Sequence, residues 1–499
     1  MKRMLFCAAL ASAAFLGIGG CAHVDSDFKD PLGSTAQLPA SPSAGYAPST
    51  LPRQEELIPD ESGPEKGSHG KGSSEKGDPT SMHTKLNFAG RTLDLAECIR
   101  IGLEFNPETQ STWQALRSAA ARVGEQQSAY FPEIDLTTGA IREKQVSFQS
   151  LQSKQQSNAD NLFTTAFALN YLLFDGGQRF ARVGGARADV GSVGFQHNAA
   201  LQSVALKIEQ SYYALLAARW SLQVAEETVH NAGYHVRLAQ ARFDTGLVPR
   251  SDVLKAETEK ADGDLALVSA RSTIRIGEGA LASAMGLKVS TPVEIADVPE
   301  GMHALEAQDM DRLLDEAMEH RPELLAAVSK VKSKQSALDD ARSQYWPKIS
   351  ANAGYGWIDD SFFPNQDQWS IGLSLSFPIF TGFKRGYQVE GASRDTEQAR
   401  AEYVSRLRGI ELEVWTAYSK LTEAAEAIQA ARTFVASAEE SARLADGEYK
   451  AGTGNIIALI DAQTALTSAR NRLVQARFAW YNTRAQFEKS VGRKISAGN

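Results

Sequence analysis

Side chains that could bind a metal or carry out acid–base catalysis are few in this chain, and they are poorly spaced. The sequence has 8 histidines among 499 residues. His230 and His235 lie five positions apart, whereas two metal ligands on one face of a helix lie four apart. A His-Glu-x-x-His helix, a Gly-x-Ser-x-Gly turn and a phosphate-binding glycine loop are also missing. The residues therefore predict neither an enzyme nor a bound metal or cofactor.

One cysteine near the start is predicted to be modified. Residues 1–3 are basic, and residues 4–18 form an apolar stretch that is too short to span a membrane. The stretch leads through two glycines to Cys21, which resembles a bacterial lipoprotein signal. We expect a signal peptide over 1–20 and a lipid anchor on Cys21, and Ala22 at the next position favours the outer membrane. An ordinary secretory signal with a chance cysteine is the alternative.

The segment after the anchor, residues 21–88, is predicted to be a flexible tether. It is rich in Pro, Gly, Ser, Lys and Glu, and cannot bury enough apolar surface to offset the entropy of ordering. The whole chain has a formal net charge of −8, which gives no support to nucleic-acid binding. Beyond Cys21 the only thiol is Cys98, so we expect no intramolecular disulfide.

Two halves of the chain carry similar motifs in the same order. Asn106-Pro107-Glu108 corresponds to Arg321-Pro322-Glu323, and Tyr130-Phe131-Pro132 to Tyr345-Trp346-Pro347, both at an offset of 215 residues. Later motifs correspond at an offset of 206: Leu173-Phe174-Asp175-Gly176 with Ile379-Phe380-Thr381-Gly382, and Arg242 to Leu247 with Glu448 to Thr453. A long repeat whose offset changes once predicts a duplicated architecture with one loop of variable length.

Each half contains a long stretch in which large residues recur every seventh position. Such a heptad predicts a coiled coil rather than an amphipathic helix on a globular core, which is the alternative. About 70 helical residues at 1.5 Å each reach roughly 100 Å. Each long helix is expected to turn at Gly246 or Gly452 and to return as a second helix ending at Gly286 or Gly492. The heptad positions are Leu201, Ile208, Leu215, Leu222, Val229, Val236 and Phe243, and Leu407, Val414, Leu421, Ile428, Val435, Ala442 and Tyr449.

Four short segments alternate between apolar and small or polar residues. They are Ile134 to Ala140, Phe163 to Leu173, Ile349 to Trp357 and Trp369 to Phe377. This pattern is typical of membrane β-barrel strands with a wet lumen, although any one strand also fits the edge of a soluble sandwich. Four strands cannot close a membrane barrel, which needs at least about eight. An open sheet edge cannot face lipid, so strands that span lipid require a barrel shared between chains.

With these motifs in this order, the chain resembles the TolC-like outer-membrane efflux family over roughly residues 93–494. The resemblance implies a mainly α fold with a small β part: a homotrimeric α-barrel of long antiparallel coiled-coil helices joined to a shared transmembrane β-barrel, four strands per chain. The repeats would be residues 89–290 and 309–499, joined by a belt over 291–308. In the outer membrane, such a trimer conducts cargo passively from an inner-membrane pump and a periplasmic adaptor to the outside.

The resemblance also implies a gate and a docking surface at the hairpin tips. The family closes its periplasmic end through tyrosine, arginine and aspartate links, and the matching residues are Asp252, Tyr449 and Asp461. Two positions depart, because Gly454 replaces the arginine and Ala458 replaces an acidic residue. The adaptor would dock on Gly246, Leu247, Gly452 and Thr453. We predict that Asp252→Ala or Tyr449→Ala raises conductance without preventing assembly, and a ring of Asp461 would favour cations.

Three functions are compatible with these residues, and they differ in how well they fit. Small-molecule or metal efflux and type I protein secretion use the same kind of exit duct, and the lipid anchor leans toward efflux. A periplasmic coiled-coil scaffold that forms no channel is an alternative of a different class. Such scaffolds carry one hairpin flanked by compact β domains, whereas this sequence predicts two hairpins and membrane-patterned strands.

Overall fold

The computed structural model describes residues 92–143, 160–297 and 309–492. The predicted signal peptide, Cys21, the tether, and residues 298–308 of the predicted belt lie outside these ranges. The helices are α1 (Leu95–Phe105), α2 (Pro107–Ser128), α4 (Gln178–Asp244), α5 (Arg250–Ala284), α6 (Met310–His320), α7 (Pro322–Ser343), α8 (Lys384–Ala451) and α9 (Ile456–Val491). The strands are β1 (Thr92–Leu93), β2 (Glu133–Glu143), β3 (Asp160–Phe174), β4 (Glu294–Ile295), β5 (Lys348–Asp359) and β6 (Gln366–Ser376).

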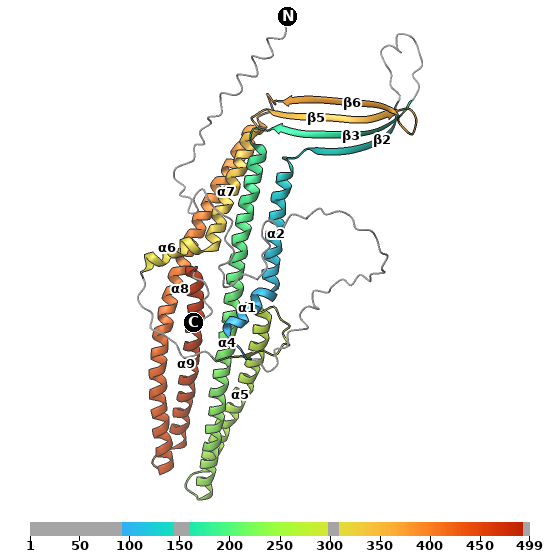
Figure 1. Cartoon of the computed structure of the whole chain (residues 1–499). Helices are drawn as coiled ribbons and strands as arrows, with labels where there is room; N and C mark the ends of the chain where they lie inside the picture. The colour runs from blue at the N-terminus through green and yellow to red at the C-terminus, as the bar shows by residue number, and fades with distance from the viewer. Residues whose placement is uncertain (1–91, 144–159, 298–308, 493–499) are drawn as a thin grey trace, which may run out of the picture. The chain divides into compact units, whose positions relative to one another are not determined.

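Both predicted coiled-coil hairpins are confirmed. The outgoing helices α4 and α8 have 67 and 68 residues, and the returning helices α5 and α9 have 35 and 36. Heptad residues such as Ile208 and Val414 are fully buried. Gly246 and Gly452 adopt positive φ at the turns, as a left-handed helix end requires. Figure 1 shows the two hairpin tips pointing the same way, away from the sheet.

The helices pack in two consecutive levels. Next to the sheet, α2, α4, α7 and α8 lie side by side in that order. Farther from the sheet, α5 packs on α4, α9 packs on both α4 and α8, and the two long helices continue through both levels. Among the described helices, none combines the length and apolar character needed to cross a membrane.

The proline motifs tie the two levels together. Asn106 caps α2, accepting a hydrogen bond at Oδ1 from the Glu108 N–H (2.8 Å), and its Nδ2 donates to the Ala284 carbonyl at the end of α5 (2.8 Å). Arg321 holds the corresponding position before α7 without a side-chain cap, and donates from Nη1 to the Ser490 carbonyl at the end of α9 (3.3 Å). The proline that follows each cap suits the first helical turn, where its missing N–H costs nothing.

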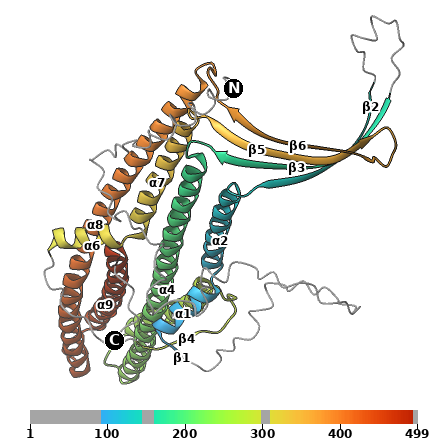
Figure 2. The same ribbon diagram turned by 45° about the horizontal axis from the view of Figure 1, so that its top comes forward.

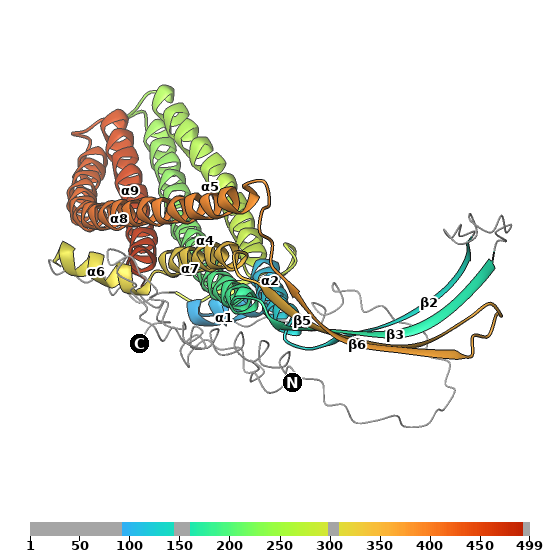
Figure 3. The same cartoon turned by 90° about the horizontal axis from the view of Figure 1, so that it is seen from above.

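The four predicted strands form one antiparallel sheet in the order β2-β3-β5-β6. Strand β2 follows α2, β3 leads into α4, β5 follows α7, and β6 leads toward α8 (Figure 2). Seen from above, the strands curve together away from the helices (Figure 3). A separate two-stranded parallel pair, β1 with β4, lies at the start of the belt segment.

Strand pairing follows the two sequence offsets. Glu133 lies opposite Asn170 in β2–β3, and Lys348 lies opposite Ser376 in β5–β6. Adding 215 to a residue of β2 and 206 to its partner in β3 reproduces every pair of β5–β6, through to Ile358 opposite Gln366. The two hairpins of the sheet therefore have the same register.

One detail of the predicted alternation is wrong. The apolar face of β3 was expected to continue through Leu173. Instead, Leu172 lies opposite Ser350 and Phe174 lies opposite Ile349, which leaves Leu173 as the extra residue of a β-bulge. The bulge moves Phe174 onto the face expected for Leu173, because one inserted residue reverses the alternation.

A buried carboxyl group lies between the two helical hairpins, where α9 packs on α4. Glu209 of α4 is almost completely buried beside Arg484 and Glu488 of α9. Burial, and then the negative charge of Glu488, raise the pKa of Glu209 to about 8, although Arg484 partly opposes them. The carboxyl group is therefore largely protonated at neutral pH.

This group is expected to make stability depend on pH. Because its folded-state pKa is raised, the folded chain retains a proton that the unfolded chain has lost, and stability falls as pH rises from about 5 to 8. The slope is at most about 1.4 kcal/mol per pH unit. Glu209→Gln should flatten a plot of melting temperature against pH over this window. A slope equal to that of the unmodified protein would contradict the assignment.

Candidate functional site

The two faces of the sheet differ sharply in chemistry. One row across the four strands is Leu136, Phe167, Tyr355 and Trp369, and another is Ile134, Leu169, Ala353 and Ile371. The opposite face carries rows such as Glu133, Asn170, Asn352 and Gly372. The apolar rows are uncovered within the described chain: Trp369 is 71% exposed and Ile371 is 80% exposed. A large exposed apolar face on a curved sheet is the pattern of a lipid-facing surface.

An arginine in each half fixes the strands to the helices. Arg179 stacks on the Tyr130 ring at 5.0 Å and donates hydrogen bonds to the carbonyls of Ala129 and Leu173, both at 3.3 Å. It also forms an ion pair with Asp175 (2.9 Å).

The corresponding Arg385 stacks on Tyr345 at 4.9 Å and donates to the carbonyls of Gln344 (3.4 Å) and Pro378 (2.6 Å). Its Nε donates to the Thr381 hydroxyl (3.3 Å), which stands where the first half has Asp175. Each guanidinium therefore joins the end of the helix before the sheet, α2 or α7, to the end of the strand that leads into the next long helix, so the strands depart from the helices in a fixed direction.

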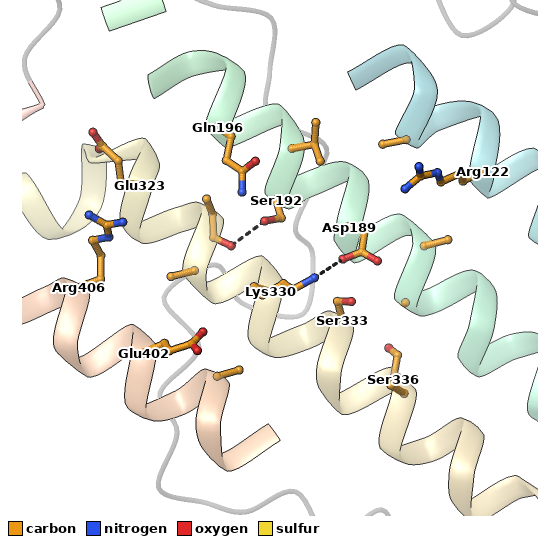
Figure 4. Close-up of a pocket in the computed structure, with 18 of the residues that line it drawn as sticks. Arg122, Asp189, Ser192, Gln196, Glu323, Lys330, Ser333, Ser336, Glu402 and Arg406 are labelled. Carbon is orange, nitrogen blue, oxygen red and sulfur yellow. Dashed lines mark hydrogen bonds and ion pairs between the residues drawn. The ribbon is translucent and has the colours of Figure 1, made fainter. Parts of the chain in front are cut away.

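A groove of about 1450 Å³ runs along α2, α4, α7 and α8 below the sheet. Half of its lining residues are alanine, serine or glycine, and charges of both signs are interspersed among them. Lys330 pairs with Asp189 at 3.2 Å, and Arg182 pairs with Asp340 at 3.2 Å. Figure 4 shows Arg122 and Arg406 on opposite sides of the groove. The charges of the wall therefore partly neutralise one another through these pairs.

The predicted gate residue Tyr449 is buried where the two hairpin tips meet. Its side chain is only 1% exposed and packs with Ile456 and Leu459 of α9 and with Leu238 of α4. Burial raises the pKa of Tyr449, the charge of Asp252 raises it further, and Arg242 opposes both. The phenol is therefore neutral, and its hydroxyl has no hydrogen-bond partner within the described residues.

Arg242 is a tip residue that the sequence patterns do not single out. Its guanidinium lies over the Tyr449 ring, 4.7 Å from the centroid, and donates to the Tyr449 carbonyl. Lys450 makes the reverse contact, with its ammonium group 5.0 Å from the centre of the Tyr234 ring. Gly454, the position at which the resemblance expects an arginine, lies in the turn between α8 and α9; the cation beside Tyr449 comes from α4. The one sequence signal for a role of Arg242 at the tip is its position, one helical turn before Gly246.

The other predicted tip residues are half-buried or exposed. Asp252 is half-buried in the first turn of α5, and Asp461 is exposed on α9. The docking residues Gly246, Leu247, Gly452 and Thr453 are all exposed at the two turns. Within the described residues no group of three or more His, Cys, Asp or Glu side chains could hold a metal ion.

Comparisons with known proteins agree on one kind of molecule. Residues 99–287 and 313–493 match the family described as "Outer membrane efflux protein". Protein CyaE of Bordetella pertussis is 25% identical over 386 residues, which are 77% of this chain and 80% of the relative. The cobalt-zinc-cadmium resistance protein CzcC of Cupriavidus metallidurans is 22% identical over 384 residues, 77% of this chain and 90% of the relative.

A solved structure shows the same fold. The outer membrane protein VceC of Vibrio cholerae superimposes with a TM-score of 0.69 at 19% identity, over 81% of this chain and 97% of VceC. The family match covers well over half of the chain, in both halves and including both hairpins. The chain belongs to the outer membrane efflux protein family.

Proposed function

We propose that this protein is the outer-membrane exit duct of a tripartite export system, and that it works as a homotrimer. The observation that carries the proposal is the sheet, whose apolar face is uncovered and whose outer strands, β2 and β6, have unpaired edges within the described chain. Unpaired strand edges are not stable in lipid, and an apolar face of this size is not stable in water. Sharing the sheet between chains pairs the edges and places the apolar face against the membrane.

The helices support a conducting role. Below the sheet, the groove along α2, α4, α7 and α8 forms the inner wall of the duct, lined by small and ion-paired side chains. Farther down, apolar side chains such as Val268 on α5 and Trp415 on α8 stand exposed and are covered by neighbouring chains. The duct is passive, since cargo is selected and driven by an inner-membrane pump acting through an adaptor at the hairpin tips.

The cargo class is small molecules or metal ions. The resistance protein CzcC, named for cobalt, zinc and cadmium, is among the relatives, which favours efflux. The lipid anchor at Cys21 and the domain boundaries given above belong to the same proposal. A lipid-anchored duct is expected in the outer membrane with its helices in the periplasm.

Single-channel recording in a planar bilayer tests the proposal. The purified oligomer should show small, stable currents that reflect a closed resting state. It should also migrate on gels as a heat-modifiable trimer. A soluble periplasmic monomer would favour the scaffold function instead and would contradict the duct. Function in type I secretion would appear as loss of an exported protein, with resistance unchanged, when the gene is deleted.

A further inference from the structure

The short loop between β5 and β6, residues 360–365, carries two exposed aromatic side chains. Phe362 is 71% exposed and Phe363 is 80% exposed, and the two rings meet edge to face with their centroids 5.1 Å apart. Figure 1 shows the loop at the end of the sheet that is farthest from the helices. An apolar pair of this size on an exposed loop indicates a surface that a partner outside the described residues covers.

Hydrogen bonds within the loop hold the two rings in place. The Asp359 carboxylate accepts from the backbone N–H of Asp360 (2.8 Å) and from that of Asn365 (3.3 Å), which links the two ends of the loop. The Ser361 hydroxyl donates to the Phe363 carbonyl (3.2 Å). A loop that is already ordered loses little further entropy when a partner covers it.

A contact with the sheet shows to which face the loop turns. Phe362 packs edge to face on Phe163 of β3, with the ring centroids 5.5 Å apart. Phe163 lies four positions along β3 from Phe167, so the two side chains share one face. Phe167 lies opposite Leu136 and Tyr355 in an apolar row. The loop therefore bends toward the apolar face, and away from the polar face that is proposed to line the lumen.

The apolar rows end at the level of this loop. From Leu375 to Asp367, β6 advances eight positions, which at 3.4 Å each and a tilt of about 40° give a height of ~21 Å. The apolar band of a membrane barrel is about 25 Å tall. Asp367 lies opposite Trp357, and the next row outward pairs Phe163 with Asp359. Carboxylates on the apolar face in these two rows mark the level at which lipid headgroups begin.

Other rings on the same face continue the aromatic surface toward the helices. Tyr355 and Trp357 meet edge to face with their centroids 5.1 Å apart, and Trp369 lies opposite Tyr355 on β6. The phenylalanine pair is thus the outermost part of one aromatic border. Lipid is the partner that fits this border, because the rows directly below it are those proposed to face the membrane.

We infer that the loop at residues 360–365 is a membrane anchor, whose Phe362 and Phe363 side chains insert into the outer leaflet at the boundary between headgroups and acyl chains. Aromatic side chains collect at this boundary because they are largely apolar yet tolerate the polar headgroups. The inference rests on the proposed orientation of the duct. It goes beyond that orientation by assigning a lipid contact to a loop outside the strands.

Spin labels at single positions test the inference. Phe363→Cys, Ile371→Cys and Ser370→Cys are each made in the full chain, labelled with a thiol-specific nitroxide and reconstituted as oligomers in phosphatidylcholine vesicles. Oxygen concentrates in lipid and a charged nickel chelate stays in water, so the ratio of their collision rates with a label measures its depth. Ile371 lies on the apolar face and Ser370 on the polar face, and they serve as the lipid and water references.

The native thiol in the described chain does not interfere with labelling. Burial, and then the charges of Asp94 and Glu97, raise the pKa of Cys98 to about 12, so the thiolate that would react is not formed at neutral pH. The unmodified protein, treated with the nitroxide in parallel, supplies the background signal.

The label at position 363 should collide more often with oxygen than with the nickel chelate, at a ratio between those of the two references. A ratio equal to that at position 370 would place the loop in water, and few collisions with either reagent would place it beneath protein. Either result would overturn the anchor. A label at position 371 that lies in water would instead reject the proposed orientation of the whole sheet, so the two failures are distinguishable.

A second variant tests the contact that directs the loop. Phe362→Ser removes the ring that packs on Phe163, and in this background the label at position 363 should move toward water. An unchanged collision ratio would contradict the step by which the contact with β3 turns the loop toward lipid. Phe362→Trp retains an aromatic ring at the same place and should leave the ratio at position 363 unchanged.

Discussion

Arg242→Ala is expected to raise the single-channel conductance several-fold. The guanidinium links the two hairpin tips of one chain through the Tyr449 ring and the Tyr449 carbonyl. A cation–π contact and a hydrogen bond to a charged donor contribute together about 2 kcal/mol. Removing them shifts the balance between linked and separated tips by roughly 30-fold. If separated tips are the open state, the tips of the variant are separated for a larger fraction of the time, and the time-averaged conductance of the channel rises.

Two controls make this result specific. Arg237→Ala removes the same charge from an exposed position of the same helix and should leave conductance unchanged. Tyr449→Ala and Asp252→Ala should raise conductance in the direction of Arg242→Ala, because Arg242 contacts Tyr449 and the charge of Asp252 acts on the same phenol. Unchanged conductance in both Arg242→Ala and Tyr449→Ala, with intact trimers, would place the resting constriction elsewhere.

The second large effect is expected on the sheet. Ile371→Arg places a charge at the centre of β6 on the apolar face, opposite Ala353. A charge facing lipid near the middle of a barrel costs about 2–4 kcal/mol per chain, and a trimer carries it three times. Heat-modifiable trimer in the outer-membrane fraction should therefore be strongly reduced.

The neighbouring residue provides the control. Ser370→Arg places the same charge one position away on the polar face, opposite Gly354. That face is proposed to line the water-filled lumen, so assembly should be retained and only conductance or ion selectivity should change. Equal loss of trimer from both variants would show that the two faces of β6 have similar surroundings, and would contradict the proposed membrane orientation.

Much of this architecture follows from patterns that are local in the sequence. The heptads from Leu201 and from Leu407 predicted helices of about the observed length, because burial every seven residues needs only the helical period. Alternation predicted which face of each strand is apolar. It failed at Leu173, where a bulge depends on how two strands meet and not on the residues of either one.

What the sequence alone determined is therefore the hairpins, the strands with their two faces, and the correspondence between the halves. Only the tertiary structure decided which distant side chains meet. Arg242 reaches Tyr449 across 207 positions, and Glu209 is buried beside Glu488. Periodicity records whether a residue is buried, because burial repeats with the local geometry of the chain. It does not record the identity of the partner, which depends on how separate helices pack together in space.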